Sequence, residues 1–308
     1  MRVTLLAGGT GGAQLAQGFD ALLPPGDLRV VTNTGDDVVM WGLRICPDTD
    51  AVLFRLGGIF NEKAGFGVAG DTSGVLDQMA RLAAPTWFHL GDKDLAFHML
   101  RTEMLNRGAR LTETALELGR RLGVRTPVLP MSDHDVRTFF LTDAGRLGFQ
   151  EYFVRERLAP ALRAIEFDGL ERARPSAEVI AAVAEADLVV IGPSNPLISI
   201  APITSLLAGE LRRERTVAVT PLVGGRALKG PTVEMLQAIR GEASAERVAR
   251  EYQGLAGWFV LDSVDRLERA AVASAGYRVM VTDTVMRDAG GARRLARAIL
   301  DGVLNGVA

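Results

Sequence analysis

The sequence predicts an α/β fold, with a Rossmann-like, mostly parallel sheet and a mainly helical inserted subdomain. First, short apolar runs are followed by glycine-rich or polar turns and then by helical patterns, near the N-terminus and again after residue 176. Second, residues 51–122 show helical rather than alternating strand and helix patterns. Third, hydrophobic residues make up 48% of the 308-residue chain, enough for a sizeable core. We therefore expect a nucleotide-binding core of residues 1–50 and 123–308, and an insertion at 51–122 that covers the site.

The first predicted strand, Val3–Ala7, leads directly into a glycine cluster. The cluster consists of Gly8, Gly9, Thr10, Gly11 and Gly12. Such a turn places free backbone N–H groups at the start of a helix, where they bind anions. The dinucleotide fingerprint does not fit, because Gln14 stands at its sixth position, and no Lys-Ser/Thr pair completes a Walker A motif. We predict a phosphate-binding turn of another subtype, with a tight turn that binds no ligand as the alternative.

The second predicted strand, Leu28–Val31, ends in Thr32 and Asn33. A nicotinamide-binding fold would place an acidic residue there to hold the ribose, so this end disfavours NAD. We assign Asn33 to the phosphate-binding residues. Four aspartates follow in predicted loops: Asp36, Asp37, Asp48 and Asp50. Carboxylates beside a phosphate site suit Mg²⁺, and we predict Asp36, Asp37 and Asp50 as its ligands. Turn capping is the alternative, above all for Asp48, which follows a proline.

The predicted insertion has helical spacing at Val75–Ala83 and a second helix that Thr112 caps and Gly123 ends. Two segments interrupt these helices. Residues 57–67 form a glycine-bounded loop, and Trp87–Asp94 is a strand-like run that ends in a turn around Lys93. A lysine flanked by aspartates is either part of a solvated salt-bridge cluster or, if the turn faces the glycine cluster, a substrate contact.

The second half returns to alternating strands and helices. Its predicted strands are Thr126–Leu129, a hairpin of Thr138–Thr142 with Leu147–Val154, Leu188–Ile191, Thr216–Thr220, Trp258–Leu261 and Arg278–Thr282, before a closing helix at 291–304. The loop after residue 191 carries Ser194 and Asn195 between prolines, which indicates a rigid, polar rim at the carboxyl end of the sheet. Arg226 and Lys229 lie in a glycine-rich turn, where they either bind phosphate or form a basic surface turn.

Composition excludes several classes of protein. A net charge of −2 argues against a nucleic-acid or anionic-membrane partner. The single cysteine, Cys46, excludes an internal disulfide framework and a cysteine-based zinc site. No apolar run approaches the length of a membrane span, and the chain enters a strand without a basic leader. We expect a cytoplasmic protein and a homodimer, the usual state of an enzyme of this size.

Six separated blocks resemble the 2-phospho-L-lactate transferase family, the enzymes of F-420 deazaflavin coenzyme biosynthesis. In chain order they are LAGGTGGAQLAQG, VTNTGDD, GLRICPDTD, WFHLGDKD, GPSNPLISI and VGGRALKG. The resemblance covers roughly residues 1 to 285. It implies a donor that is a guanosine diphosphate ester of a three-carbon acid (lactyl, enolpyruvyl or glyceryl). It also implies an acceptor, the deazaflavin riboside Fo, whose terminal ribityl hydroxyl attacks the phosphorus that bears the acid and releases GMP.

The resemblance also implies roles for individual residues. The last aspartate of the family's CPD-x-D block falls on Asp50, and the basic residue of its GD-[RK]-D block falls on Lys93, so both would contact the deazaflavin. Asp50 would also hold metal or help to deprotonate the attacking hydroxyl. Ser194 and Asn195 match the block expected near the guanosine, as does the glycine cluster. This chain has Lys93 where many relatives carry arginine, which keeps the charge but loses the bidentate fork.

The main alternative is a non-catalytic regulatory protein of a related fold that binds a nucleotide sugar. In those relatives we expect a glycine- and serine-rich stretch directly after the paired aspartates. Residues 38–41 are Val-Val-Met-Trp instead, which favours the transferase. A nicotinamide oxidoreductase is disfavoured by the incomplete fingerprint and by Thr32 and Asn33 at the end of the second strand.

Overall fold

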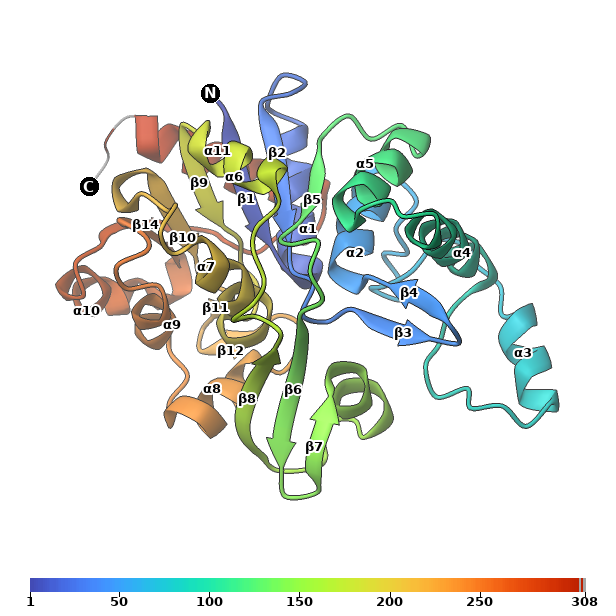
Figure 1. Ribbon diagram of the computed structural model, residues 1–308. Helices are drawn as coiled ribbons and strands as arrows, with labels where there is room; N and C mark the ends of the chain where they lie inside the picture. Colours follow the sequence, from blue (N-terminus) through green and yellow to red (C-terminus); the bar gives the residue numbers. More distant parts are fainter. Residues whose placement is uncertain (305, 307–308) are drawn as a thin grey trace.

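The computed structural model describes residues 1–304 and 306, and its centre is a seven-stranded sheet (Figure 1). The strand order is β14-β13-β10-β9-β1-β2-β5, and every neighbouring pair is parallel. The strands are β1 (Val3–Ala7), β2 (Leu28–Thr32), β5 (Val128–Pro130), β9 (Leu188–Ile191), β10 (Thr216–Val219), β13 (Trp258–Asp262) and β14 (Arg278–Thr282). The predicted α/β class is confirmed, and each predicted strand of the central sheet is present within two residues of its expected ends.

The order of the strands determines where the sheet has a crevice that can bind a ligand. Strand β1 lies between β2 and β9, so the chain leaves β1 toward one side of the sheet and later returns on the other. Loops that follow such neighbouring strands diverge, and the crevice between them is the usual ligand site of an open α/β sheet. The glycine cluster follows β1 and the loop at 192–195 follows β9, so both lie at this crevice.

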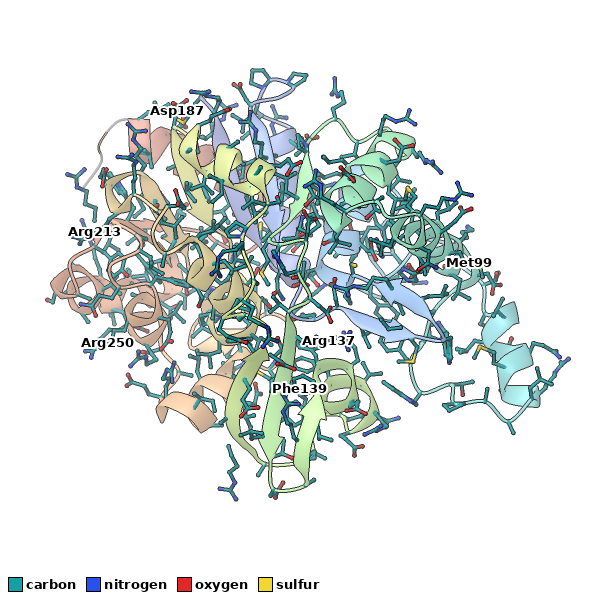
Figure 2. All side chains as sticks on the ribbon, viewed as in Figure 1. Met99, Arg137, Phe139, Asp187, Arg213 and Arg250 are labelled. Carbon is teal, nitrogen blue, oxygen red and sulfur yellow. The ribbon has the colours of Figure 1, made fainter. Side chains whose placement is uncertain are left out.

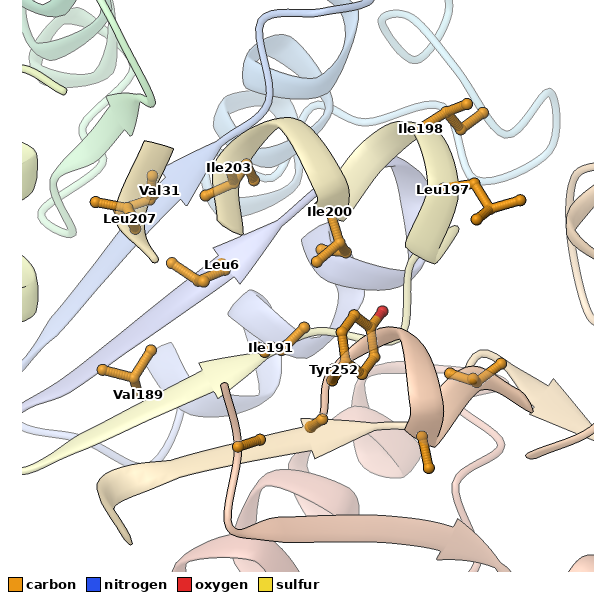
Figure 3. Packing of buried hydrophobic residues seen from close by; sticks show 14 of the residues in the cluster. Leu6, Val31, Val189, Ile191, Leu197, Ile198, Ile200, Ile203, Leu207 and Tyr252 are labelled. Carbon is orange, nitrogen blue, oxygen red and sulfur yellow. The ribbon is translucent and has the colours of Figure 1, made fainter. Parts of the chain in front are cut away.

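Both faces of the sheet are buried, which explains why its strands are continuously apolar. Alternate residues of one strand point to opposite faces. In β1, Leu6 belongs to one core cluster, which Figure 3 shows with Val189, Ile191 and Tyr252. Its neighbour Leu5 belongs to the cluster on the other face. The helices of the sheet region are α1 (Gly9–Asp20), α6 (Ala177–Ala184), α7 (Ala201–Leu207), α8 (Thr232–Arg240), α9 (Ala245–Glu251), α10 (Arg269–Ser274) and α11 (Ala289–Leu304).

The segment between β2 and β5 is largely helical. A short hairpin of β3 (Val38–Met40) and β4 (Leu43–Ile45) is followed by α2 (Pro47–Leu56), α3 (Gly74–Arg81), α4 (Asp92–Asn106) and α5 (Leu111–Arg121). Figure 1 shows these helices beside the sheet, with α3 farthest from it. Helix α2 begins at Pro47, so Asp48 and Asp50 lie in its first turn. The prediction that these two residues lie in a loop is therefore wrong. Proline is favoured at this position and acidic residues stabilise a first turn.

Two predicted details of this region are wrong. The run Trp87–Asp94 contains no strand, because Asp92 begins α4; the Asp71 carboxylate caps that helix by accepting the N–H groups of Lys93 and Asp94 at 2.8 and 3.1 Å. Thr112 lies inside α5 rather than at its cap, and its N–H donates to Asp133 Oδ1 at 2.8 Å. In both cases a carboxylate distant in sequence binds the first turn, which local spacing does not indicate, although at α5 the nearby Glu113 also accepts the N–H of the cap residue Arg110.

A second sheet, antiparallel, has the order β7-β6-β8 and extends away from the central sheet (Figure 1). Its strands are β6 (Arg137–Thr142), β7 (Gly145–Gly148) and β8 (Leu162–Asp168). The predicted hairpin is confirmed, but β7 stops at Gly148 and not at Val154, because Glu151–Arg155 is helical. Phe149 and Phe153 therefore come together on one face and stack at 4.4 Å.

The surface carries scattered apolar side chains. Met99, on α4, is 54% exposed (Figure 2). None of the described helices is long and apolar enough to cross a membrane.

Candidate active site

A cavity of about 1160 Å³ opens at the predicted crevice. It is lined by residues 8–11 of the glycine cluster, by residues 193–195 after β9, by Thr220 after β10, and by segments 228–232 and 284–289. Asp36, Asp48 and Phe149 also line it. The cavity therefore lies at the ends of four parallel strands, β1, β9, β10 and β14, and reaches Phe149, which directly follows β7 of the antiparallel sheet.

The glycines are required because two loops touch. A Cβ on Gly11 would overlap the carbonyl oxygen of Pro193, and one on Gly8 would overlap the side chain of Ser199. A Cβ on Gly12 would lie 2.8 Å from Ala7. Gly9 differs, because its φ of +60° is left-handed and only Asp48 Oδ1 lies near its Cβ position, at 3.7 Å. The glycine cluster thus lets the backbone after β1 pack directly against the segment after β9.

The first backbone N–H groups of the cluster have partners within the protein. Gly8 N donates to Ser194 Oγ at 3.3 Å, and the same hydroxyl donates back to the carbonyl of Gly8. Gly9 N donates to Asp48 Oδ1 at 2.6 Å. The N–H groups of Thr10 and Gly11 come next, in the first turn of α1, where a helix offers them no partner. These two residues line the cavity, so an anion there meets a helix N-terminus.

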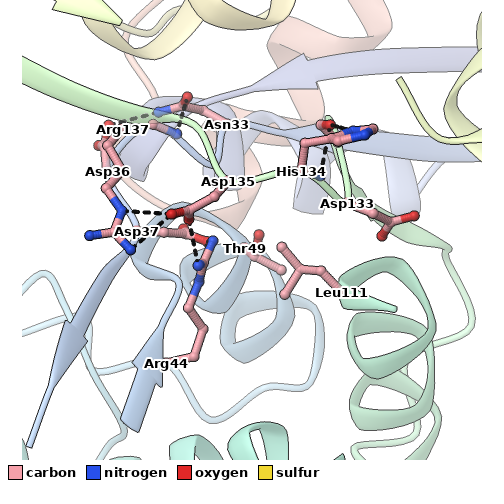
Figure 4. A network of polar contacts seen from close by, with 12 residues as sticks. Asn33, Asp36, Asp37, Arg44, Thr49, Leu111, Asp133, His134, Asp135 and Arg137 are labelled. Atoms are coloured by element: carbon pink, nitrogen blue, oxygen red, sulfur yellow. Dashed lines mark hydrogen bonds and ion pairs between the residues drawn. The ribbon is translucent and has the colours of Figure 1, made fainter. Parts of the chain in front are cut away.

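Two buried carboxylates, Asp36 and Asp48, face the same cavity. Asn33 Nδ2 donates to Asp36 Oδ1 at 2.7 Å (Figure 4). It also donates to Asp48 Oδ2 at 3.1 Å, so one amide binds both carboxylates. Asn33 is fully buried behind them and does not line the cavity. Burial raises the pKa of Asp48 to about 7, and burial with the neighbouring charge of Asp48 raises the pKa of Asp36 well above its usual value.

Asp37 has a different environment. Its carboxylate pairs with Arg44 at 3.0 Å, and Arg44 also pairs with Asp135 at 2.8 Å (Figure 4). Burial raises the pKa of Asp37 to about 6 although Arg44 opposes the rise. The predicted metal ligands Asp36, Asp37 and Asp50 are thus not brought together, because Asp37 and Asp50 each face an arginine. Within residues 1–304 and 306, no three His, Cys, Asp or Glu side chains are grouped so as to hold a metal ion.

A second, smaller pocket of about 190 Å³ adjoins the first, and we call it the inner pocket. Gly9, Thr10 and Asp48 line both spaces and form a shared wall. The inner pocket is otherwise mostly apolar and aromatic, with Ile45, Phe54, Phe60, Phe66, Phe88 and Leu90 among its lining residues. Its polar lining residues include Asp50, Asp94, His89 and His98. A flat, partly polar ring system fits such a lining.

Asp50 is the most constrained of the predicted site residues. Both of its carboxylate oxygens accept hydrogen bonds from Arg101, one of them at 3.0 Å. His98 Nδ1 lies 3.7 Å from Asp50 Oδ2. All three side chains are at least 95% buried. Burial of an ion pair is costly unless its geometry is good, and here it is bidentate.

Of the three predicted basic residues, Lys93 and Arg226 lie outside both spaces and Lys229 lines the large cavity. Lys93, in the first turn of α4, donates to the carbonyls of Gly70 and Ala69 at 2.8 and 3.3 Å and lines neither space. Arg226, on β12 (Arg226–Ala227), is exposed and lines neither space either. Lys229, three residues on, does line the large cavity. Phosphate binding by this turn stays a prediction, and Lys229 rather than Arg226 is placed to provide it.

Sequence reasoning missed Arg101 and His98. With Asp94 they stand at i, i+4 and i+7 on α4, so three ionisable residues share one stripe of the helix. That spacing is visible in the sequence and could have indicated that the three side chains lie together. Nothing in the sequence paired Arg101 with Asp50, which lies 51 residues earlier. Arg55 was also missed; it is 3% exposed, pairs with Glu62 at 2.5 Å and lies over the ring of Phe60.

Comparisons with known proteins identify the family of the chain. Residues 3–297 match the family described as 2-phospho-L-lactate transferase CofD. The chain is 36% identical over 310 residues to the phosphoenolpyruvate transferase of Streptomyces avermitilis, covering 97% of each protein. It is 33% identical over 298 residues to the 2-phospho-L-lactate transferase of Methanosarcina mazei, covering 96% of this chain and 98% of that protein.

A solved structure supports the fold alone. The crystal structure of a UPF0052 family protein from Bacillus halodurans is similar to this chain with a TM-score of 0.62 at 15% identity, over 97% of this chain and 98% of that one. The predicted family is confirmed by the sequence matches, which extend over almost the whole chain. The protein belongs to the 2-phospho-L-lactate transferase CofD family of enzymes.

Proposed function

We propose that the protein transfers a phospho-three-carbon-acid group from a guanosine diphosphate ester to the ribityl hydroxyl of the deazaflavin Fo, in F-420 biosynthesis, with release of GMP. The observation that carries this proposal is the shared wall of Gly9, Thr10 and Asp48 between a large polar cavity and a small aromatic pocket. A reaction between two substrates needs such a boundary, at which the reacting atoms of both can meet.

The donor would occupy the large cavity. Its diphosphate would face the N-terminus of α1 at Thr10 and Gly11, with Lys229 as a mobile cation. Asn195 lines the same cavity; its side chain accepts the N–H of Leu197 at 2.9 Å. Ser194 would act indirectly, because its hydroxyl already bonds to Gly8. The guanosine assignment itself comes from the family resemblance.

The acceptor ring would occupy the inner pocket, with Asp50 beside it. In the transfer the ribityl oxygen forms a bond to the phosphorus that bears the acid, and the bond from this phosphorus to the oxygen of GMP breaks. The hydroxyl proton needs an acceptor. Asp50 is poorly suited, because the cationic Arg101 binds both of its oxygens, whereas the oxygens of Asp48 accept only from the neutral N–H groups of Gly9 and Asn33. Asp48 lines both spaces and has a pKa of about 7, so we assign the proton to its carboxylate.

Mg²⁺ would neutralise the charge that the donor brings. This ion typically binds one or two carboxylates and completes its coordination with substrate phosphates and water. Asp36 fits that description, because its buried carboxylate lines the cavity beside Asp48 and the pKa values of both are raised. Those raised values indicate a site short of positive charge. When bound, the ion would stabilise the negative charge of the transferred group.

A turnover test decides the proposal. The protein is incubated with Fo and either a lactyl or an enolpyruvyl guanosine diphosphate donor, with and without Mg²⁺, and products are identified by mass spectrometry. We expect GMP and a phosphodiester of Fo, only with metal and with one donor preferred. Failure of both donors to react, although GDP binds, would contradict the proposal and favour a nucleotide-binding regulatory protein.

We also propose that the protein is a homodimer, the commonest assembly of enzymes this size. Light scattering during size-exclusion chromatography measures the mass directly. A mass near twice the 33.0 kDa of one chain is expected, and a mass of one chain would contradict the proposal.

A further inference from the structure

Arg55 is a buried cation whose partner is an exposed carboxylate. Its side chain, in the last turn of α2, is 2% exposed, and its Nη1 donates to Glu62 Oε1 at 2.5 Å. The Glu62 side chain is 63% exposed, and both residues line the large cavity. A buried guanidinium needs an anionic partner, whereas an exposed carboxylate is stable in water by itself. Arg55 therefore requires an anion at this place, but Glu62 does not require Arg55.

A ligand reaches Arg55 through the atom that Glu62 occupies. The other two nitrogens of the guanidinium group, Nε and Nη2, are buried and form no hydrogen bond with the part of the chain that the structure describes. The loop that carries Glu62 is closed at its base, where Asn61 N donates to the carbonyl of Gly67 at 2.9 Å. Because the Glu62 side chain is mostly exposed, its rotation into solvent is enough to free Nη1, and the backbone of the loop need not move.

Arg55 also lies at the boundary between the two spaces. The carbon of its guanidinium group is 4.1 Å from the centroid of the Phe60 ring, and Phe60 lines the inner pocket. Asp48, at the shared wall, stands seven residues before Arg55 on the same helix. Both residues therefore lie on one stripe of α2, ~10 Å apart along its axis.

We propose that Arg55 binds the carboxylate of the three-carbon acid that the protein transfers, and that this carboxylate displaces Glu62. The inference rests on the proposed function for the identity of the donor. In that donor the acid is attached to the phosphorus that reacts, so its carboxylate must lie near the boundary. Lactyl, enolpyruvyl and glyceryl groups all carry this carboxylate, and a guanidinium forms strong, charge-assisted hydrogen bonds with it. Glu62 is the internal carboxylate that keeps Arg55 paired until the donor binds.

The loop of Glu62 approaches a second cation of the large cavity. A Cβ on Gly65 would lie 3.4 Å from Lys229 Nζ, so residues 62–65 reach from Arg55 to Lys229. The donor brings its diphosphate and its carboxylate to this region together. Departure of the Glu62 carboxylate offsets the charge of the incoming carboxylate, so the exchange adds no net charge at Arg55. GDP has no carboxylate and therefore leaves Glu62 in place.

The test compares two ligands that differ only in the carboxylate. Calorimetry, with Mg²⁺ and without Fo, measures the Kd of the guanosine diphosphate ester of lactate and of its carboxamide, in which a neutral amide replaces the carboxylate. Wild-type protein should bind the carboxamide roughly tenfold or more weakly. Arg55→Met should bind the two ligands equally. Glu62→Gln, which changes an exposed side chain, should bind the carboxylate ligand severalfold more tightly and the carboxamide as the wild type does.

Each result decides the inference separately from the proposed function. Equal binding of the two ligands by the wild type, no binding of either, an unchanged preference in Arg55→Met, or an unchanged Kd for the carboxylate ligand in Glu62→Gln would overturn it. Turnover with Fo reports on the proposed function, so product formation together with any of these results would overturn the inference alone. Glu103→Gln, an exposed carboxylate of α4 that pairs with Arg107, is the matched control and should bind both ligands as the wild type does.

Discussion

The two spaces that meet at Asp48 are built in different ways. The large cavity depends on backbone: Gly8, Gly11 and Gly12 allow the loop after β1 to rest against the loop after β9. The inner pocket depends on side chains, with Asp50 held by Arg101 and Asp94 beside His98. Backbone contact of this kind tolerates no added atom, whereas a side-chain pair tolerates replacement of both members together. The two regions should therefore respond differently to mutation.

The largest effect is expected from Asp50→Ala. It would leave the Arg101 guanidinium buried without its partner, which typically costs ~3–5 kcal/mol of unfolding free energy. The double variant Asp50→Ala/Arg101→Met should be more stable than the single variant, because it removes both charges. Chemical denaturation monitored by circular dichroism gives both values. A single variant as stable as the wild type would show that the pair does not hold the inner pocket.

The second largest effect of a single substitution is expected from Gly11→Val, which should lower the free energy of unfolding by on the order of 3 kcal/mol. Its Cβ would meet the carbonyl of Pro193, so the damage is to the contact between loops and not only to a phosphate site. No second substitution should rescue it, in contrast to Asp50. Gly209→Ala, which meets nothing within 4 Å, is the matched control for thermal denaturation. Unchanged stability in Gly11→Val would contradict the backbone account of the large cavity.

The buried carboxylates at the boundary predict a pH dependence. The pKa of Asp48 is 3.8 in the reference state and about 7 in the folded protein, so the folded state binds more protons between these values. The free energy of unfolding should therefore fall as pH rises from about 4 to 7, by on the order of 4 kcal/mol from this group. Asp48→Asn should reduce the slope in denaturation curves at pH 5 and pH 8. An equally steep slope in the variant would contradict the assignment.

Lys93→Ala should have the smallest effect on stability, within ~0.5 kcal/mol, because the side chain is exposed. Its Nζ holds the carbonyls of Ala69 and Gly70, in the segment that follows the pocket residues Phe66 and Gly67. We expect a raised KM for Fo and an unchanged Kd for GDP, measured by steady-state kinetics and calorimetry. A raised Kd for GDP would show that Lys93 acts on the large cavity, which would contradict its assignment to the inner pocket.

These differences also explain what the sequence could predict. The central strands and the glycine cluster are local patterns, since apolar runs and adjacent glycines are visible without partners. Ser194 and Asn195 were placed at the cavity rim for the same reason. The pairing of Asp50 with Arg101 and the caps from Asp71 and Asp133 were not predictable, because they join segments about 20 or more residues apart.

The four aspartates show most clearly what cannot be predicted from the sequence. Asp36, Asp37, Asp48 and Asp50 look alike in the sequence, and the family motif drew attention to Asp50. Only the fold separates them: two face arginines and two face the cavity. Asp48, which the sequence indicated was a turn cap, accepts the N–H of Gly9 and lies at the shared wall.

The central claim is that donor and acceptor occupy adjacent spaces at the same time. Calorimetric titration of Fo into protein saturated with GDP and Mg²⁺ tests it most directly. We expect one Fo to bind per chain, with an affinity close to that for the GDP-free protein. Loss of Fo binding when GDP is present, or release of GDP as Fo binds, would show that the two ligands compete for one space and would contradict the account.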